Sequence, residues 1–334
     1  MESSIKDNRP MISVVMSVYN GEQTVENAID SILNQSFRNF ELIIIDDGST
    51  DKTLKILEAY QQLDCRIRII SRENKGLIYS LNEGFKASKG KYIARHDDDD
   101  RSHPERFKLQ FNFLEENNDH VLVGSSHKVE SESGKYLRLF LLPETNDEIK
   151  SNIHNGCFAH GAVMIRASAI EHVGLYNPTA KHAEDLDLFI RLSKYGKVHN
   201  LPHILYSWTL RRGSVSGRNV QSQNYSKRKI KEFYTNYSDS CCVVPYLKFE
   251  EEKQDSALKT DDYFNMVLID KGYVHFIHEV FSKRYFFRKK SNLIKLFGLK
   301  FWMLTSEVYH SKLQVGLTKA LFKKFRSLTY KVDF

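Results

Sequence analysis

The sequence predicts an α/β fold with a mostly parallel sheet, helices on both faces, and a mostly helical C-terminal region. Short apolar runs alternate with segments whose apolar residues recur at helical spacing, which is the pattern of βαβ units. The first run, residues 11–18 (MISVVMSV), is continuously apolar and rich in β-branched residues, as expected for a strand buried on both faces. With 334 residues, 41% of them hydrophobic, the chain can bury one large core.

The same alternation predicts the elements in chain order. Thr24 is the expected N-cap of the first helix, and Pro104 the expected first residue of a later one, where its missing N–H costs nothing. The second helix is expected to end near Tyr60, and two further helices are expected at residues 77–87 and 186–195. Strands are expected at residues 11–18, 41–45, 67–70, 92–95, 121–124, 161–166 and 204–208.

Polar clusters follow three of the predicted strands. They are residues 17–20 (SVYN), residues 46–49 (DDGS) and residues 96–100 (HDDDD). The carboxyl ends of parallel strands meet at one edge of a sheet, where open α/β sheets bind their ligands. We therefore expect a ligand site at this edge.

Four consecutive aspartates, Asp97 to Asp100, follow the apolar start of the segment YIARHDDDDR. Two unit charges about 4 Å apart repel by roughly 4 kcal/mol at an effective dielectric near 20, so these carboxylates need water or a cation. In extended backbone Asp97 and Asp99 project to the same side and can offer two oxygen ligands to one divalent ion. The alternative is a solvated acidic loop. The position at a strand end favours the metal site.

Two common nucleotide-binding motifs are absent from the chain. The first strand-to-helix turn reads YNGE and lacks G-x-G-x-x-G, and residues 84–91 (GFKASKGK) depart from the P-loop in spacing and position. These departures argue against a dinucleotide-binding enzyme and a P-loop protein. Divalent ions commonly bridge carboxylates and diphosphate oxygens, so a metal on the acidic run is the expected means of holding phosphates.

The net charge of +7 is concentrated at the C-terminus. Residues 283–334 hold 13 Lys or Arg against Glu307 and Asp333, a charge of +11, so residues 1–282 carry −4. Bases alternate with aromatic and apolar residues there, as in helices that lie on anionic membranes. A helical subdomain with a solvated basic face is the alternative. Nucleic-acid binding also explains the charge, but nothing in the first domain supports it, so we expect no nucleic-acid partner.

Three further features favour the cytoplasm. The four cysteines, Cys65, Cys157, Cys241 and Cys242, lack the spacing of a zinc site or a disulfide framework. The N-terminus MESSIKDNRP has no apolar signal region, and no run of about 18 apolar residues occurs that could cross a membrane. We therefore expect a cytoplasmic protein, peripheral on the inner face of the plasma membrane.

Five segments, taken together, resemble the inverting nucleotide-sugar glycosyltransferases of family 2, which have the GT-A fold, of the bacterial surface-polysaccharide type. The resemblance covers roughly residues 11–217 and implies a catalytic domain at 1–217, followed by a helical, basic region at 218–334. It implies a nucleotide-diphosphate sugar donor, a UDP-sugar above others, an Mn²⁺ or Mg²⁺ cofactor, and a glycan or lipid-linked oligosaccharide acceptor. The segments are ISVVMSVYNGEQTVENAIDSILNQSF, FELIIIDDGSTDKT, ENKGLIYSLNEGF, GKYIARHDDDDRSHPERF and HAEDLDLFIRL.

The resemblance also implies roles for single residues. Asp99 is the expected metal ligand together with Asp97, and Asp98 stands where the family commonly has a small residue, which leaves open which aspartate meets the ion. Asp185, next to Glu184, matches the catalytic base. The nucleotide sugar is expected to be bound by Ser17, Tyr19, Glu22, Asp46, Asp47, Lys75, Arg95, Asp97, Asp98 and Arg211.

Some of these positions have a purely structural alternative. Asp46 and Asp47 precede Gly-Ser, a favoured turn, so one aspartate is expected to serve the turn and the other the ligand. Glu184 and Asp185 also suit the first turn of a helix, where acidic residues interact favourably with the helix macrodipole.

The segment at residues 208–216 departs from the family. Thr209 and Arg211 stand where many relatives have Arg and His in a loop that closes over the diphosphate, although Arg211 or Arg212 can still bring positive charge to the leaving group. The alternative to an enzyme is therefore a non-catalytic nucleotide-sugar-binding protein or membrane-bound scaffold of the same fold. Two residues are expected on the acceptor side, His160 and Asp100.

Overall fold

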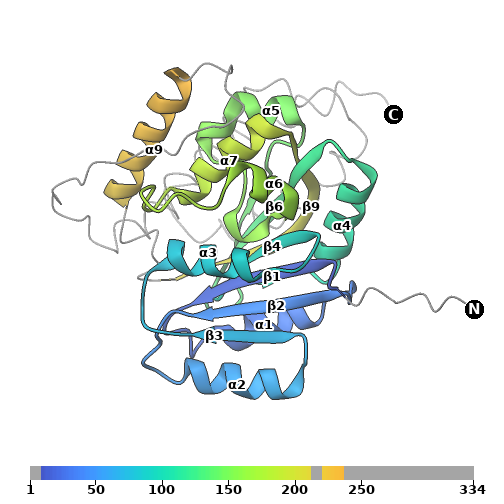
Figure 1. Ribbon diagram of the computed structural model, residues 1–334, viewed down its shortest axis with the longest axis vertical. Helices are drawn as coiled ribbons and strands as arrows, with labels where there is room; N and C mark the ends of the chain where they lie inside the picture. Colours follow the sequence, from blue (N-terminus) through green and yellow to red (C-terminus); the bar gives the residue numbers. More distant parts are fainter. Residues whose placement is uncertain (1–8, 212–219, 237–334) are drawn as a thin grey trace, which may run out of the picture. The chain divides into compact units, whose positions relative to one another are not determined.

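The computed structural model describes residues 9–211 and 220–236, all of which belong to the first of two compact units of the chain (Figure 1). Its nine-stranded sheet has the order β3-β2-β1-β4-β8-β6-β9-β5, with β7 paired to β6. The strands are β1 Ile12–Val18, β2 Phe40–Asp46, β3 Ile67–Ser71, β4 Tyr92–Asp97, β5 Arg101–Ser102, β6 His120–Ser131, β7 Tyr136–Phe140, β8 Met164–Arg166 and β9 Lys197–Leu210. The helices are α1 Val25–Leu33, α2 Thr53–Leu63, α3 Leu77–Ala87, α4 Arg106–Glu116, α5 Asn146–Asn152, α6 Ala167–Val173, α7 Glu184–Tyr195 and α9 Val220–Asn236, with 3₁₀ helices η1 Ile153–Asn155 and η2 His160–Ala162.

The sheet combines a parallel half with a mixed half. β3, β2, β1 and β4 are parallel neighbours. β8 runs antiparallel to both β4 and β6, while β6 and β9 are parallel. Helices cover both faces of this sheet (Figure 1). The predicted fold class, a mostly parallel sheet between helices, is confirmed.

Strand β1 shows why its sequence is continuously apolar. All seven of its residues are buried. Val14 and Met16 face the core under α1, α2 and α4, whereas Val15 faces the core under α3, α6 and α7. Because its alternate side chains enter the two cores, this strand stabilises both layers. Each fully buried aliphatic side chain contributes roughly 1.5–3 kcal/mol.

Two helix starts differ from the prediction. Pro104 does not begin a helix, because its carbonyl accepts a hydrogen bond from Ser36 N at 2.8 Å, and α4 starts at Arg106. Thr24 does precede α1, but its hydroxyl donates to the Gly21 carbonyl at 3.4 Å and does not cap a helical N–H. In both cases a contact made outside the helix decides the geometry of its first turn.

The second half of the chain departs further from the prediction. The predicted strand at 161–166 is only half extended, because Ala162 N donates to the Ala159 carbonyl and closes the 3₁₀ turn η2 before β8. β6 and β9 are longer than predicted since they pair with each other along most of their length. Helix α5 was not predicted, although Thr145 and Glu148 form a capping box that the sequence TNDE indicates.

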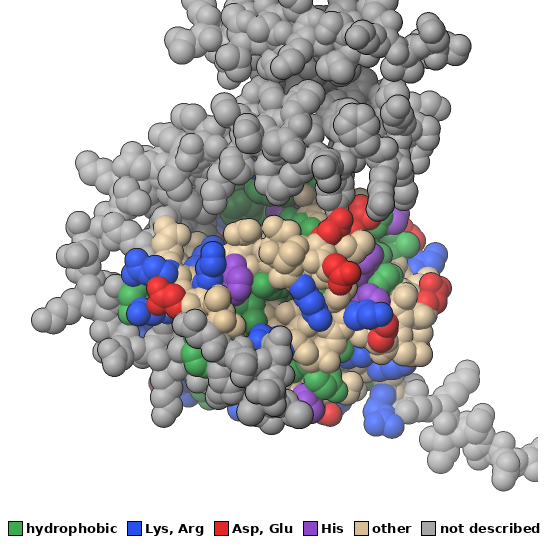
Figure 2. Space-filling model, turned by 90° about the horizontal axis from the view of Figure 1, so that it is seen from above, with side chains coloured by type: hydrophobic (Ala, Val, Ile, Leu, Met, Phe, Trp, Pro, Cys, Tyr) green, Lys and Arg blue, Asp and Glu red, His purple; other side chains and the backbone are tan. Residues whose placement is uncertain are grey.

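The described residues carry a mixed surface. On the face in Figure 2, basic and acidic side chains lie interspersed among the coloured, described residues. Within those same residues no helix is long and apolar enough to span a membrane. The basic segment at 283–334 and its predicted membrane contact lie outside the described residues, and the domain boundary at 217 stays a prediction.

Candidate active site

The predicted ligand edge is present at the carboxyl ends of three neighbouring strands. β1 pairs with β2 and β4 so that Val18 lies beside Asp46 and Ser17 beside Asp97. Ser17 is largely buried at this edge, with 9% of its surface exposed. The three polar clusters, which are far apart in the sequence, therefore meet at one edge of the sheet.

The turn after β1 is fastened to the turn after β2. Asn20 takes a left-handed backbone conformation (φ 53°), and its Oδ1 accepts a hydrogen bond from Thr50 N at 2.8 Å. Glu22 Oε2 accepts one from Lys52 N at 3.0 Å, so this carboxylate is engaged within the protein. Tyr19 is 51% exposed at the same turn, where its ring offers an apolar face to a ligand.

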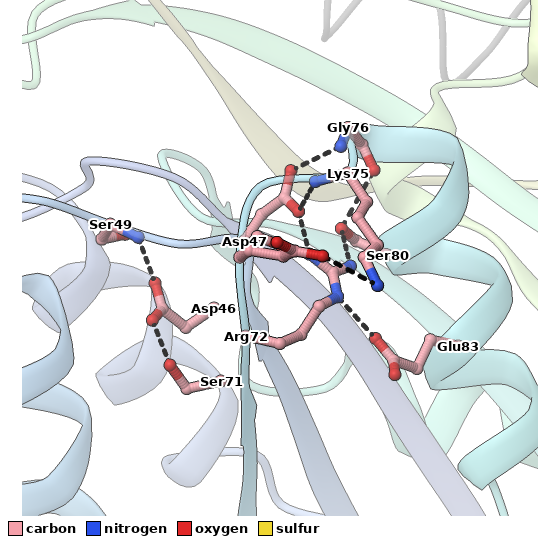
Figure 3. A network of polar contacts seen from close by, with 10 residues as sticks. Asp46, Asp47, Ser49, Ser71, Arg72, Lys75, Gly76, Ser80 and Glu83 are labelled. Atoms are coloured by element: carbon pink, nitrogen blue, oxygen red, sulfur yellow. Dashed lines mark hydrogen bonds and ion pairs between the residues drawn. The ribbon is translucent and has the colours of Figure 1, made fainter.

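Asp46 takes the turn role. Its Oδ1 accepts a hydrogen bond from Ser49 N at 3.1 Å, which closes the turn after β2 (Figure 3). Its Oδ2 accepts one from Ser71 Oγ at 2.7 Å, so the same carboxylate also joins β2 to the end of β3. Asp46 is 1% exposed, and both of its oxygens are used inside the protein.

Asp47 anchors the loop that leads into α3. Its Oδ1 accepts a hydrogen bond from Lys75 N at 2.8 Å, its Oδ2 accepts one from Gly76 N at 2.9 Å, and the Arg72 guanidinium forms an ion pair with it (Figure 3). The Lys75 ammonium lies 3.4 Å from Glu73 Oε1. Asp47 thus fixes the backbone of this loop at the ligand edge, and its contact with a nucleotide stays a prediction.

The acidic run is held between β4 and β9. Asp97 N donates to Tyr206 Oη at 3.1 Å, and Asp100 Oδ1 accepts a hydrogen bond from Thr209 N at 2.8 Å. Asp100 is 1% exposed, so its carboxylate lies inside the protein against β9. Arg95, 2% exposed, forms an ion pair with Asp97 from beneath the run. These contacts make Asp100 a residue that closes the loop onto β9.

Burial and mutual repulsion raise the pKa values of the run. The pKa of Asp99 rises to about 6, because the carboxyl is buried and the charge of Asp97 is near, while Arg211 opposes the rise. Burial, together with the charges of Asp99 and Asp97, raises the pKa values of Asp98 and Asp100 well above the ordinary aspartate value. Arg211 Nη1 lies 3.4 Å from Asp99 Oδ2, so the altered 208–216 segment still brings positive charge to the run. The run as a whole favours binding a cation.

The residues of the run fit a divalent ion. Asp97 and Asp99 keep 33% and 24% of their side chains exposed, and carboxylate oxygens are the ligands that Mg²⁺ and Mn²⁺ prefer. Within residues 9–211 and 220–236, no three acidic, His or Cys side chains are gathered around one metal position. Two carboxylates suffice, because Mg²⁺ usually completes its coordination with substrate phosphates and water.

Glu184 and Asp185 open helix α7. Asp185 Oδ1 accepts a hydrogen bond from Leu186 N at 2.7 Å, and Glu184 is 7% exposed. Burial raises the pKa values of both carboxyls, that of Glu184 to about 7, with the charge of Asp185 adding to the latter shift. A carboxylate with a raised pKa suits a general base that works near neutral pH.

The acidic run and the start of α7 lie within electrostatic reach of one another. The charge of Asp97 raises the pKa of Glu184. The charge of the Arg95 guanidinium opposes the rise in the pKa values of Asp99, Glu184 and Asp185 alike. One buried cation is therefore shared by two acidic centres that come from distant parts of the sequence.

Glu184→Gln is expected to raise the melting temperature by a few degrees at pH 8 and to change it little at pH 5. The pKa of Glu184 is higher in the folded chain, about 7, than in the unfolded chain, so the folded state binds this proton more tightly. Stability from the protonated form is present below the unfolded pKa and is lost as pH rises through the folded pKa. Calorimetry at both pH values measures the effect, and an equal gain at pH 5 and pH 8 would contradict it.

His160 is buried near the charge of Arg95. Its Nε2 is 2.8 Å from Tyr176 Oη, within hydrogen-bonding distance. Burial, together with the charge of Arg95, lowers its pKa well below the ordinary histidine value, so the ring is neutral. The structure thus accounts for His160 as a buried residue that is hydrogen-bonded to Tyr176, and its predicted contact with an acceptor stays a prediction.

Two residues that shape the acidic run have no signal in the sequence. Tyr206 supports the backbone of Asp97 through its hydroxyl. A Cβ at Gly161 would collide with that hydroxyl and would lie 2.7 Å from Asp97 Oδ2, so only glycine fits there. Because this contact joins β4, η2 and β9, no local pattern could reveal it.

Comparisons with known proteins agree with this geometry. The family model described as Glycosyl transferase family 2 matches residues 13–174. An uncharacterized glycosyltransferase of Haemophilus influenzae is 32% identical over 296 residues, which are 81% of this chain and 91% of that protein. The O-antigen biosynthesis glycosyltransferase WbnJ of Escherichia coli is 35% identical over 187 residues, 54% of this chain and 71% of that protein.

A solved structure supports the fold. The crystal structure of S. aureus TarS 1-349 in complex with UDP-GlcNAc superposes with a TM-score of 0.56 at 20% identity, over 83% of this chain and 74% of that chain. The residues that the family model matches include the sheet edge with its three polar clusters. This chain belongs to glycosyl transferase family 2, and it is a glycosyltransferase. The predicted family is confirmed.

Proposed function

We propose that this glycosyltransferase moves a sugar from a nucleotide-diphosphate donor to a hydroxyl of a glycan or lipid-linked acceptor, with inversion at the anomeric carbon and with Mn²⁺ or Mg²⁺ at the acidic run. A UDP-sugar is the favoured donor. One observation carries the proposal: two acidic centres from distant parts of the sequence, the acidic run and the start of α7, both feel the charge of the buried Arg95, which forms an ion pair with Asp97. The carboxylates of the run suit a metal, and the raised pKa at the start of α7 suits a base.

The residues divide the work of one displacement. Asp185 accepts the proton of the acceptor hydroxyl while the hydroxyl oxygen attacks the anomeric carbon from the face opposite the diphosphate. The new C–O bond forms as the bond to the diphosphate oxygen breaks, so the configuration inverts without a second carboxylate nucleophile. Arg211, 3.4 Å from Asp99, brings positive charge to the leaving group. A divalent ion held by Asp97 and Asp99 would supply Lewis-acid stabilisation of that group.

Two observations support a UDP-sugar donor. The fold resembles that of S. aureus TarS, which was crystallised with UDP-GlcNAc. The half-exposed ring of Tyr19 offers a stacking surface for a nucleotide base at the ligand edge. Which nucleotide base and which sugar the protein selects then depends on the contacts that this edge makes with the donor.

The biological setting follows from the relatives. The E. coli relative is named an O-antigen biosynthesis glycosyltransferase, which supports a role in making a bacterial capsule, O-antigen or exopolysaccharide. Acceptors of that kind are commonly lipid-linked at the inner face of the cytoplasmic membrane. The basic segment 283–334 is the part of the chain that would contact this membrane surface.

A donor screen tests the proposal. The melting temperature is measured with UDP-, GDP- and dTDP-sugars, each with and without Mn²⁺. We expect UDP-sugars to stabilise the protein much more with Mn²⁺ than without it, because the metal is proposed to hold the diphosphate. A ligand at about 100 times its Kd adds about 2.7 kcal/mol to the free energy of unfolding. No stabilisation by any nucleotide sugar would contradict the proposal.

Product analysis separates catalysis from mere binding. Donor turnover is followed with and without a panel of acceptors, and the anomeric configuration of the product is read by NMR. A transferase of the proposed kind consumes the donor and inverts the anomeric carbon, whereas a scaffold protein binds the donor without consuming it. A product that retains the donor configuration would rule out direct displacement.

A further inference from the structure

Helix α9 is fixed beside the start of α7. Its buried face is formed by three residues at i, i+4 spacing, Ser226, Ile230 and Tyr234. Ser226 Oγ donates to the Lys181 carbonyl at 2.9 Å, and Tyr234 Oη donates to Asp187 Oδ1 at 2.9 Å. Because α9 is anchored at both ends of this face, the side chains that border the face have defined positions.

A pocket lies where α9, the η1 turn and the start of α7 meet. Phe158, Phe189 and Cys157 provide apolar walls, while Asp185 and Lys227 bring charge to it. Asp185 is the proposed base, so this pocket adjoins the point where an acceptor hydroxyl must lie. The pocket offers about 50 Å³ of space, which suits a small charged group such as a carboxylate or phosphate rather than a whole sugar ring.

Lys231 follows Lys227 by one turn of α9 and lies near enough to the pocket for its charge to affect His154 in the pocket lining. Its charge, together with burial, lowers the pKa of the pocket residue His154. The Nδ1 atom of His154 is buried and has no hydrogen-bond partner among the residues that the structure describes. A buried polar atom without a partner is costly, so a ligand that reached it would recover a hydrogen bond.

The two lysines carry charge that no carboxylate pairs with in the described ranges. Neither Lys227 nor Lys231 forms an ion pair there, whereas Lys229 between them lies 3.6 Å from Glu232. Burial raises the pKa of Asp185, and Lys227 lies near enough for its charge to oppose that rise. A concave, partly apolar site with one such cation in its lining and a second one turn along the same helix attracts anions.

We propose that this pocket binds an anionic group of the acceptor, a carboxylate or a phosphate, between Lys227 and Lys231. The inference rests on the proposed function, because it names the acceptor class of the same site. The anion belongs to the acceptor and not to the donor, since the donor phosphates are assigned to the acidic run at the sheet edge. The pocket then holds the charged group, and the acceptor ring that carries it lies at the pocket opening.

Three methyl glycosides that differ only at carbon 6 test this inference, those of glucose, glucuronic acid and glucose 6-phosphate. Their affinities for the full chain are measured by ligand-observed NMR in the presence of UDP and Mn²⁺. We expect a charged glycoside to bind about tenfold more tightly than the neutral one, since charge-assisted hydrogen bonds are the strong ones. A preference for the uronate indicates an acidic sugar, and a preference for the phosphate indicates a phosphorylated acceptor.

Variants of α9 locate the effect. Lys227→Met and the double variant Lys227→Met/Lys231→Met should lose the preference, and Lys227→Arg should keep it. Lys229→Met is the matched control, because it removes the same charge from the same helix at a residue that pairs with Glu232. The preference should survive in this control.

Two results would overturn the inference. One is equal binding of charged and neutral glycosides by the wild type, and the other is a preference that persists in the double variant. UDP binding with Mn²⁺, measured in the same samples, reports separately on the proposed function. A chain that failed to bind UDP would refute that function whether or not it preferred charged glycosides.

Discussion

Asp185→Asn is expected to lower the rate of sugar transfer by about 10²- to 10⁴-fold, the usual contribution of a positioned base, with donor affinity near that of the wild type. The base matters chiefly while the acceptor proton moves, so its loss should appear in kcat rather than in donor binding. An asparagine fits the site, because its Oδ1 can accept the Leu186 N–H that Asp185 Oδ1 accepts at 2.7 Å. The amide cannot take the acceptor proton.

The structural alternative predicts a different outcome for the same variant. If Asp185 only satisfies the first turn of α7, asparagine serves that turn nearly as well, and turnover should hardly change. Transfer rate, donor affinity and melting temperature are therefore measured on one preparation. A folded variant that binds the donor and transfers sugar at the full rate would refute the assignment of the base.

Asp99→Ala is expected to remove the metal-dependent part of nucleotide binding, weakening affinity for UDP in Mn²⁺ by at least about 100-fold. Asp99 is a partly exposed carboxylate at the end of β4, and its loss leaves one fewer hard oxygen ligand beside Asp97. Arg211 loses its partner in this variant, so weak binding of UDP that does not depend on metal is expected to remain. Calorimetric titration with UDP, with and without Mn²⁺, measures both parts.

A matched control and a second variant sharpen this test. Glu58→Gln removes one negative charge from an exposed position on α2 and should leave the UDP titration unchanged. Asp98→Ala tests whether the ion binds this aspartate instead. The side chain of Asp98 lies at the turn after β1, where its Oδ2 would be 2.7 Å from a Cβ added at Gly21. Unchanged affinity in Mn²⁺ for Asp99→Ala would remove this residue from the metal site.

The layered fold was largely predictable because its signals are local. The apolar run at β1, the helical spacing in α1 and α3, and the turn residues between them each reflect which side chains one short segment can bury. The errors occur where a distant contact overrides the local preference. Pro104 suits a helix start, yet its carbonyl is bound to Ser36 N, and α4 begins two residues later.

The candidate site was predictable in part for the same reason. Strand ends identify the acidic run and the pair Asp46–Asp47, because parallel strands deliver their carboxyl ends to one edge. What each carboxylate binds was not predictable. Asp47 holds the loop before α3, and Asp100 lies inside the protein against Thr209 N, because side-chain direction depends on partners far along the chain.

By itself the sequence determined the order of strands and helices in the first hundred residues, the family, and the acidic residues offered for chemistry, since these follow from periodicity, motifs and residue type. Only the tertiary structure decided that Arg95 is shared by the acidic run and the start of α7, that Gly161 gives room to Tyr206, and that Lys227 borders the pocket of Asp185. The physical reason is that a local pattern fixes which face of a segment is buried. Distances between groups far apart in the chain are set by how those faces pack, and electrostatic interactions depend on those distances.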